Sequence, residues 1–384
     1  MPLSADLILP ANDAESLREI ASWDGFRPAT FAPSDFPIDV VRFEGSASRP
    51  VMISRGRRAE TLKAMPATLR HRAETAFERA ARRPAILRLG NERTLDFSKG
   101  PVLMGVVNVT PDSFSDGGLL FDRDRAVERG LRMYEEGAAI VDIGGESTRP
   151  SSYGAARELS AEEEIARVIP VIAGIRAASG APISVDTRKS AVAREALAAG
   201  ADLVNDVSAG RFDPFMAGVI AGSGAGAILM HMKGTDPRVM QEDLHYDHPV
   251  ADIAAALAQA ADRSIGAGVS DASIAVDPGL GFGKSPEGNL ALLRHLAAFL
   301  SLGFPVCVGA SRKAFVRRFS GIADDAPAPE RLPGSLAALA AACAGGGAIL
   351  RVHDVPESAH FLRLLQAITR VPSPASAPVG VRVR

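Results

Sequence analysis

The sequence predicts a (β/α)8 barrel preceded by a smaller mixed α/β extension. Two observations lead to this fold class. From about residue 84 the chain alternates short apolar runs with amphipathic stretches, and eight such runs occur within about 290 residues. The runs are largely apolar on both faces, which is typical of parallel strands covered on both sides. Eight strand and helix repeats over this length favour a closed barrel, and a doubly wound open sheet is the alternative.

Each apolar run is assigned to a strand, and the stretches between the runs are assigned to helices. In chain order, the predicted strands are Val102–Val107, Ala139–Ile143, Ile183–Val185, Leu203–Val204, Ala227–Met230, Ile274–Val276, Pro305–Val308 and Ala348–Val352. The predicted helices include Arg123–Glu136, Ala161–Ala178, Lys189–Ala199, Val250–Gly266, Pro286–Leu302, Pro333–Ala344 and Glu357–Thr369. Two helix starts carry recognisable caps, because Ser160 with Glu163 forms a capping box and Ser285 precedes Pro286.

The ends of the chain do not follow this rhythm. Residues 1–83 form an extension of unknown role, in which 13–23 and 58–83 are predicted helices and 26–45 supplies a strand or two. Residues 84–371 form the barrel, and Gly90 with Asn91 marks the turn of a hairpin that closes its amino-terminal end. The composition of residues 372–384, rich in Pro, Ala and Ser, predicts a disordered tail.

The composition limits the classes of partner. A hydrophobic content of 47% with 23% charged residues is typical of a soluble globular protein, and a net charge of −2 argues against a nucleic-acid partner. The two cysteines lie in apolar surroundings without metal-ligand spacing, and the first residues lack the features of a secretory signal. No apolar run is long enough to cross a membrane. We therefore expect a cytoplasmic protein that binds small molecules.

Polar side chains lie at the carboxyl end of each of the eight predicted strands or just beyond it. They are Asn108, Asp142 with Glu146, Asp186, Asn205 with Asp206, His231, Asp277, Ser311 with Lys313, and Arg351 with His353. One such residue at a strand end is most often a helix cap or a turn former. Polar groups at all eight ends favour an active site instead, because the carboxyl ends of barrel strands meet at one face.

Some of these residues suit an anion and a metal ion. Arg149 lies in a long loop after the second strand and is a natural anion ligand, whereas Asn108 and Asp116 offer oxygen atoms suited to Mg²⁺. Arg351 and His353 occupy alternate positions of the last strand and hence the same face. Two potential cations there suggest a bound phosphate group.

The middle strands suit a flat heterocycle. Asp186, Asn205 and Asp277 can accept and donate hydrogen bonds along a ring edge that carries amino, N–H and carbonyl groups. Lys313 could bind a ring nitrogen or carbonyl oxygen in the same place. Together with the anion-binding residues, this set predicts a nitrogen heterocycle that carries a phosphate-type leaving group.

The stretch IAVDPGLGFGKS, residues 274–285, has the appearance of a nucleotide-binding loop but does not fit either glycine signature. The phosphate-binding signature requires glycine five residues before Gly283, where Pro278 stands without an N–H group. The dinucleotide signature requires glycine at position 284, which is lysine. We interpret the stretch as a strand that delivers Asp277, followed by a sharp glycine-rich turn.

Seven motifs in order resemble dihydropteroate synthase of folate biosynthesis. The motifs are MGVVNVTPDSFSDGG, DIGGESTRP, SVDTRK, VNDVSAG, DPGLGFGK, GASRK and RVHDV, and the resemblance covers roughly residues 85–371. It implies a (β/α)8 barrel that is usually a homodimer, with Mg²⁺ as cofactor. It also implies a transferase that joins 6-hydroxymethyl-7,8-dihydropterin diphosphate to 4-aminobenzoate and releases pyrophosphate.

The resemblance also implies a role for each matching residue. The pterin ligands would be Asp186, Asn205, Asp277, Lys313 and Arg351, the diphosphate ligands Asn108, Arg149, Arg351 and His353, and the magnesium ligands Asn108 and Asp116. The aminobenzoate pocket would be formed by Phe114, Thr148, Pro150 and Phe282, and the residues closest to catalysis would be Asp116, Lys313, Arg351 and His353. The implied mechanism is dissociative, because the diphosphate leaves before the aniline nitrogen captures the pterin methylene cation.

The chain departs from the family pattern at Ala314, where the family commonly has serine after the lysine of the SRK motif. Backbone N–H groups would then have to bind the aminobenzoate carboxylate. Two other functions remain as alternatives: a corrinoid-dependent pterin methyltransferase, and a non-catalytic pterin-binding or regulatory protein. The presence of GASRK and RVHDV favours the synthase over the methyltransferase, which would not need the residues for diphosphate and aminobenzoate. Against a non-catalytic protein, all the expected loop and cationic residues are in place, namely Asn108, Asp116, Arg149, Lys313, Arg351 and His353.

Overall fold

The structure is a computed structural model that describes most of the barrel and parts of the extension. The described residues are 7–11, 38–42, 51–54, 58–67, 70–71, 73–74, 77–78, 84–109, 118–146, 159–236, 240–246, 248–323 and 327–370. The predicted helix at 13–23 and the predicted tail at 372–384 lie outside these ranges.

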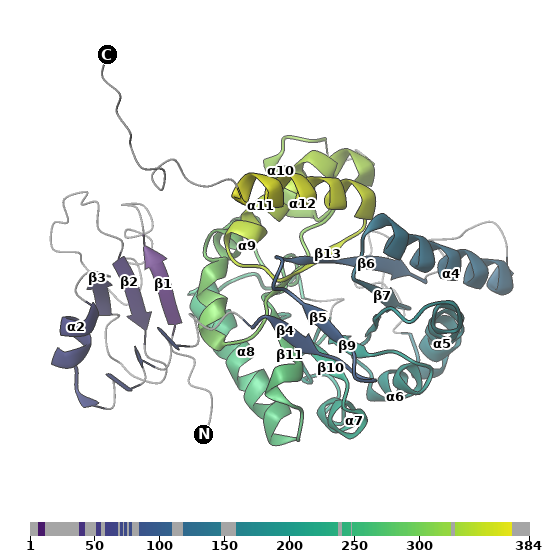
Figure 1. The fold of residues 1–384 in the computed structure, drawn as a ribbon, viewed down its shortest axis with the longest axis horizontal. Helices are drawn as coiled ribbons and strands as arrows, with labels where there is room; N and C mark the ends of the chain where they lie inside the picture. Colours follow the sequence, from purple (N-terminus) through teal and green to yellow (C-terminus); the bar gives the residue numbers. More distant parts are fainter. Residues whose placement is uncertain are drawn as a thin grey trace, which may run out of the picture.

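Eight parallel strands form the barrel, as predicted (Figure 1). They are β6 (Val102–Asn108), β7 (Ile140–Gly144), β8 (Ile183–Asp186), β9 (Leu203–Asp206), β10 (Gly226–Met230), β11 (Ile274–Asp277), β12 (Cys307–Val308) and β13 (Ile349–Val352). The ladder runs from β11 down to β6 and then through β13 to β12. A parallel bridge between Val276 and Val306 joins the two ends of this ladder. The sheet is therefore closed, and the open doubly wound alternative is wrong.

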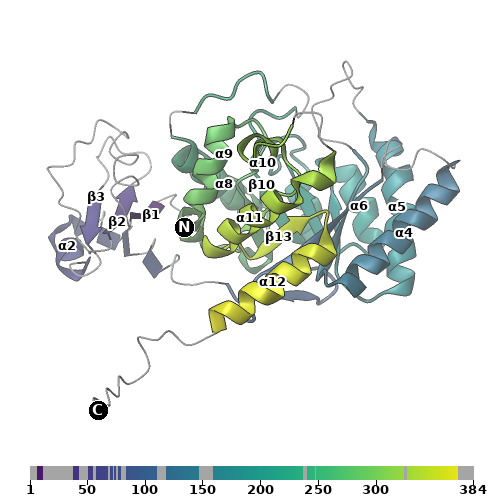
Figure 2. The same ribbon diagram turned by 90° about the horizontal axis from the view of Figure 1, so that it is seen from above.

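Helices surround the strands in the expected alternation (Figures 1 and 2). They are α4 (Gly118–Glu136), α5 (Ala161–Ala178), α6 (Ser190–Ala198), α7 (Met216–Ser223), α8 (Pro249–Gly266), α9 (Pro286–Arg294), α10 (Ala314–Phe319), α11 (Leu332–Ala344) and α12 (Val355–Arg370). The short 3₁₀ segments are η4 (Asp271–Ser273), η5 (Leu296–Leu302) and η6 (Ala328–Arg331). Both predicted caps are present, since Ser160 and Glu163 form a complete capping box and Ser285 accepts the Gly288 N–H at 3.0 Å.

Three helical segments differ from the sequence prediction. The helix expected over 286–302 ends at Arg294, and the chain continues as η5, whose residues Leu296, Phe299 and Leu302 are buried. An apolar stretch of this kind does not reveal whether its period is 3.6 or 3.0 residues per turn. Helices α7 and α10 were not predicted, because α7 is short and rich in small residues and α10 has only six residues.

A hairpin closes the amino-terminal end of the barrel, as predicted. Strands β4 (Ile86–Arg88) and β5 (Thr94–Asp96) pair antiparallel, and Leu87, Leu89 and Leu95 are buried. They pack on a layer of residues in the amino-terminal parts of seven barrel strands, namely Met104, Ile140, Leu203, Ile228, Ala275, Cys307 and Ile349. The turn is centred one residue later than predicted, because Asn91 and Glu92 have positive φ angles of 54° and 58°.

Asp202 fastens this hairpin to the barrel. Its buried carboxylate accepts hydrogen bonds from Asn91 at 2.8 Å, from Arg93 at 2.9 Å and from Arg176 of α5 at 2.6 Å. The backbone of Gly90 also donates to the Asp202 carbonyl at 2.8 Å. Gly90 suits this position because a Cβ atom there would lie 3.3 Å from the Asp202 carbonyl oxygen.

The described part of the extension has mixed α/β structure. Strands β1 (Leu7–Ala11), β2 (Ile38–Arg42) and β3 (Val51–Ser54) form an antiparallel sheet in the order β1-β2-β3, followed by α2 (Arg58–Ala64). Of these strands only β2 was predicted. Figures 1 and 2 show this sheet at the side of the barrel, and β1 lies beside η5. Among the described helices, none combines the length and apolar character that a membrane span requires.

Candidate active site

The carboxyl ends of the barrel strands bring most of the predicted polar residues to one rim, here called the mouth. Asn108, Asp186 and Asp277 are the last residues of β6, β8 and β11. Asn205 is the penultimate residue of β9, and Arg351 is the penultimate residue of β13. Strands from opposite halves of the sequence therefore contribute to a single site, as the barrel prediction required.

Arg351 and Asp142 form the centre of a buried polar cluster. Asp142 of β7 is fully buried, and its Oδ2 atom accepts hydrogen bonds from Arg351 Nε at 2.7 Å and from Asn205 Nδ2 at 3.0 Å. Its Oδ1 atom accepts from Ser184 Oγ at 2.6 Å. Arg351 Nη2 also donates to Asp186 Oδ2 at 2.7 Å. The cluster thus orients Asp186 and Asn205, two of the predicted ring-binding residues.

Asp142 is the site residue that sequence reasoning missed. It appeared only as one of several polar groups near strand ends, and it received no role. The signal was present, because Asp142 is an acidic residue inside the otherwise apolar run AIVDIG. A buried acid in a barrel strand needs a partner, and Arg351 is that partner.

The contacts within this cluster change the pKa values of Asp186 and Arg351. Burial raises the pKa of Asp186 to about 7, the Arg351 guanidinium opposes this shift, and the nearby Asp142 carboxylate adds to it. Burial works against the charge of Arg351, but the carboxylates of Asp142 and Asp186 outweigh it and raise its pKa above the ordinary value. Arg351 therefore stays charged, whereas Asp186 can change its protonation state near neutral pH.

Asp277, Lys313 and Phe282 form the second part of the mouth. Asp277 is buried, and its Oδ1 atom accepts the Gly279 N–H at 2.6 Å. Lys313 Nζ donates to the Leu280 carbonyl and lies 4.6 Å from the centre of the Phe282 ring. Burial lowers the pKa of Lys313 to about 8, opposed by the Asp277 carboxylate, and burial raises the pKa of Asp277, opposed by Lys313.

The glycine-rich turn after β11 shapes this part of the mouth. Gly279, Gly281 and Gly283 have φ angles of 69°, 81° and 70°, which favour glycine. At Gly279 a Cβ atom would lie 1.9 Å from the His231 carbonyl oxygen, so no other residue fits without a backbone shift. The turn therefore brings the backbone close to β10, and it presents Phe282 beside Lys313.

Lys284 ties this turn to the end of β10. Its buried Nζ donates to the His231 carbonyl at 2.8 Å and to the Phe282 carbonyl at 3.0 Å, and it lies 3.0 Å from His231 Nδ1. Burial, together with the charge of Lys284, lowers the pKa of His231 to about 2, so this imidazole stays neutral. The buried Lys284 side chain thus connects two loops by hydrogen bonds. These contacts agree with the interpretation that residues 274–285 do not form a phosphate-binding loop.

His353 lies just beyond the end of β13, next to the loop that follows β12. Its backbone N–H donates to Ser311 Oγ at 3.3 Å, and its Nδ1 atom lies 3.2 Å from the same oxygen. The neighbouring Lys313 comes from the same loop. The two carboxyl-terminal loops of the barrel therefore bring His353, Lys313 and Arg351 to adjacent parts of the rim.

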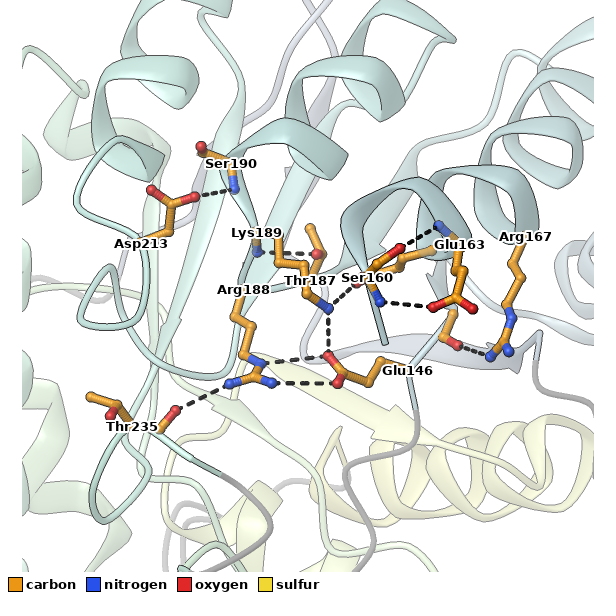
Figure 3. A network of polar contacts seen from close by, with 12 residues as sticks. Glu146, Ser160, Glu163, Arg167, Thr187, Arg188, Lys189, Ser190, Asp213 and Thr235 are labelled. Atoms are coloured by element: carbon orange, nitrogen blue, oxygen red, sulfur yellow. Dashed lines mark hydrogen bonds and ion pairs between the residues drawn. The ribbon is translucent and has the colours of Figure 1, made fainter. Parts of the chain in front are cut away.

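A second polar network joins loops that follow the barrel strands (Figure 3). The Glu146 carboxylate accepts Lys189 Nζ at 2.9 Å and pairs with Arg188 Nη2 at 3.4 Å. Lys189 also donates to the buried Glu164 of α5 at 2.6 Å, and Arg188 donates to the Thr235 carbonyl at 3.3 Å. Burial alone would raise the pKa of Glu146, but Lys189 and Arg188 lower it. The network joins the loops that follow β7, β8 and β10.

Several predicted site residues cannot be placed in this geometry. Phe114, Asp116, Thr148, Arg149 and Pro150 lie outside the described residues. Asn108 is half-buried at the rim and offers an amide oxygen, which is a ligand type that Mg²⁺ accepts. Within the described ranges, no group of three or more His, Cys, Asp or Glu residues could hold a metal ion.

The fold and the mouth together match one protein family. The family model described as pterin binding enzyme matches residues 104–353, which span the barrel from β6 to the end of β13. The chain therefore belongs to the pterin-binding enzyme family.

The similar proteins within that family include dihydropteroate synthases. The chain is 44% identical to the dihydropteroate synthase of Mycobacterium leprae, over 70% of this chain and 94% of that protein. It is 41% identical to the Synechocystis enzyme, over 72% of this chain and 92% of that protein. These relatives place the chain with the dihydropteroate synthases.

Solved structures agree with this assignment. The chain is similar to dihydropteroate synthase from Xanthomonas albilineans with 4-aminobenzoic acid, at 41% identity and a TM-score of 0.69, covering 76% of this chain and all of that one. The same enzyme in complex with 7,8-dihydropteroate gives 40% identity and a TM-score of 0.66, covering 75% of this chain and all of that one.

Proposed function

We propose that this chain condenses 6-hydroxymethyl-7,8-dihydropterin diphosphate with 4-aminobenzoate to give 7,8-dihydropteroate and pyrophosphate. One observation carries the proposal beyond family membership. Asp186, Asn205, Asp277 and Lys313, from four different elements, gather at one rim and are oriented there by Arg351, Asp142 and the glycine-rich turn. These groups supply both acceptors and donors for the edge of a pterin ring.

The ring-binding residues would also assist the chemistry. In the proposed reaction the bond between the pterin methylene carbon and the diphosphate oxygen breaks, and the electron pair leaves with the oxygen. The carboxylates of Asp186 and Asp277 stabilise positive charge on the pterin while it lasts. The aniline nitrogen then forms the new C–N bond and loses a proton to the medium. No step requires a nucleophilic side chain.

The diphosphate leaving group would be bound by residues at or after the first two barrel strands, β6 and β7, and the last one, β13. We assign Asn108, Arg149, Arg351 and His353 to the diphosphate, and Asn108 with Asp116 to Mg²⁺. The positive charge of the ion would stabilise the negative charge that develops on the departing oxygen. Arg351 is already committed to two carboxylates through Nε and Nη2, so its guanidinium would reach the diphosphate by its remaining N–H groups.

The second substrate would bind between Phe282 and the residues 114, 148 and 150. Phe282 is half-buried beside Lys313, which supports its role as one wall of an aminobenzoate pocket. Ala314 begins α10 and has no hydroxyl group, so backbone N–H groups would have to receive the aminobenzoate carboxylate. We further propose a cytoplasmic location, which agrees with the two free cysteines, Cys307 and Cys343. The proposal of a homodimer rests on the resemblance to the family alone.

A pyrophosphate-release assay tests the function. The full chain should release pyrophosphate from the pterin diphosphate when 4-aminobenzoate is present, and a truncation that starts near residue 84 shows whether the extension is needed. Asp277→Asn and Lys313→Ala should each reduce kcat/KM sharply. Arg318→Gln, on the exposed face of α10, is the matched control and should behave as the parent. Absence of release by the full chain would refute the proposal.

A further inference from the structure

The loops that follow β12 and β13 are connected residue by residue. Ser311 contacts His353, as described above, and the next residue of each loop forms an ion pair. Arg312 Nε donates to Asp354 Oδ2 at 3.0 Å, and Arg312 Nη2 donates to Asp354 Oδ1. The pair is bidentate and mostly buried, since the side chains of Arg312 and Asp354 are 26% and 12% exposed. Two parallel bonds of this kind fix distance and direction together.

Arg312 also has an unusual backbone conformation. Its φ angle is 60°, in the left-handed region that non-glycine residues seldom adopt. The surrounding structure holds it there, because its N–H donates to Ser335 Oγ at 3.0 Å and its carbonyl accepts Arg331 Nη1 at 2.9 Å. Backbone strain persists only where neighbouring groups determine the conformation, and it gathers at functional sites.

The left-handed residue determines where the next side chain points. Arg312 turns outward to Asp354, and Lys313 turns inward to the Leu280 carbonyl and the Phe282 ring. The charged groups that act on the Lys313 amine come from three other strands and the β11 turn. They are Asp186 of β8, Asp277 of β11, Arg351 of β13 and Lys284. A rotation at Arg312 would withdraw the amine from all of them.

We propose that Arg312 and Asp354 are positioning residues that hold Lys313 and His353 in the mouth. The pair clamps the β12 loop to the β13 loop, so that the lysine of one and the histidine of the other face the same space. Neither Arg312 nor Asp354 needs to touch substrate for this role. The inference rests on the proposed function only in assigning Lys313 and His353 to the substrate; the clamp itself is a property of the free protein.

A labelling experiment tests the clamp without any turnover. The full chain, Asp354→Asn, Arg312→Gln and the control Arg318→Gln are treated with acetic anhydride over a range of pH, and the modification of each lysine is measured by mass spectrometry. In the parent and in the control, Lys313 should titrate near its lowered pKa of about 8. In the two clamp variants its titration should move toward the ordinary value of 10.5, because the amine reaches solvent. Arg312→Lys should lie between, since a lysine cannot form two parallel bonds.

Buried Lys284 provides an internal check in the same samples. If Lys313 titrates alike in the parent and in both clamp variants, the proposal is wrong. It is also wrong if Lys284 becomes reactive together with Lys313. That result would mean that the Arg312–Asp354 pair supports the whole barrel and does not position one side chain. Selective exposure of Lys313 with protected Lys284 is the expected result.

If the parent protein is active in the pyrophosphate-release assay, steady-state kinetics provide a second test. Asp354→Asn and Arg312→Gln should each lower kcat/KM roughly a hundredfold, the loss associated with a displacement of about 1 Å in a catalytic site. The double variant should lose no more than either single one, because both changes open the same clamp. Additive losses would contradict a shared role. If the parent releases no pyrophosphate, the proposed function fails, whereas the labelling result still decides whether the clamp exists.

Discussion

Arg351 of β13 joins Asp142 of β7 to Asp186 of β8 through two ion pairs of 2.7 Å each. Arg351 lies far along the sequence from the two aspartates, which come from the consecutive strands β7 and β8, and β7 and β13 both flank β6 in the barrel. One arginine therefore determines the orientation of two carboxylates, only one of which was expected to bind the substrate. The buried Asp142 therefore supports, through Arg351, the carboxylate of Asp186, which we propose binds the pterin ring.

This relationship leads to the first prediction, for Asp142→Asn. The change keeps the shape of the side chain but removes its charge and places an NH2 group among the donors Arg351, Asn205 and Ser184. We expect kcat/KM to fall roughly a hundredfold, as a misoriented site would require. Ser184→Ala, which removes one hydrogen bond and no charge, should cost much less. Steady-state kinetics of both variants check this, and equal losses would show that charge is not the cause.

The sequence predicted the barrel and its rim well because both depend on local patterns. Apolar runs mark parallel strands, and a polar residue after each run marks the mouth, so Asp186, Asn205 and Asp277 could be assigned before any geometry was known. Asp142 could not, because its role depends on Arg351, more than two hundred residues away. Such a pairing follows from closure of the barrel and not from any local spacing.

The second prediction concerns Gly279→Ala. A methyl group at this position would lie 1.9 Å from the His231 carbonyl oxygen, and φ is 69°, so both space and conformation oppose it. The turn must move away from β10, and Phe282 and Asp277 would move with it. We expect a loss of pterin affinity together with a lower Tm. Gly210→Ala is the matched control, because its φ of 73° imposes similar strain while a Cβ atom there meets nothing within 4 Å. Equal pterin affinity in the two variants would refute the explanation by close approach.

The third prediction is a bell-shaped dependence of kcat/KM on pH. Asp186 has a pKa of about 7 and becomes an effective hydrogen-bond acceptor only above it, whereas Lys313 has a pKa of about 8 and loses its charge above that value. Activity should therefore fall on the acid side as Asp186 is protonated and on the alkaline side as Lys313 is deprotonated. Arginine in place of Lys313 should remove the alkaline limb within the range where the protein is stable. A profile that is flat from pH 6 to 9 would exclude both assignments.

The differences between sequence and structure also have identifiable causes. Helix α10 was missed because six residues carry too little periodicity, and the helix expected over 286–302 stops at Arg294 because the sequence cannot distinguish a 3₁₀ segment from an α-helix. The clamp between Arg312 and Asp354 was invisible for another reason. Nothing in the motifs SRK and RVHDV indicates that Arg312 pairs with Asp354 or that the backbone of Arg312 is left-handed.

The fourth prediction is a loss of stability in Asp202→Asn. The fully buried carboxylate compensates Arg93 and Arg176 and accepts the amide of Asn91, so removing its charge leaves two partly buried guanidinium groups without their anion. Breaking a buried ion pair costs about 3 kcal/mol or more of unfolding free energy. Thermal and urea unfolding should show this loss of stability. In native-state hydrogen exchange, the amide protons of the β4–β5 hairpin should lose protection before those of the barrel strands. Glu128→Gln, which breaks an exposed pair with Arg132 on α4, should leave the unfolding midpoint unchanged. An Asp202→Asn variant with the stability of the parent would mean that apolar packing of Leu87, Leu89 and Leu95 alone holds the hairpin on the barrel.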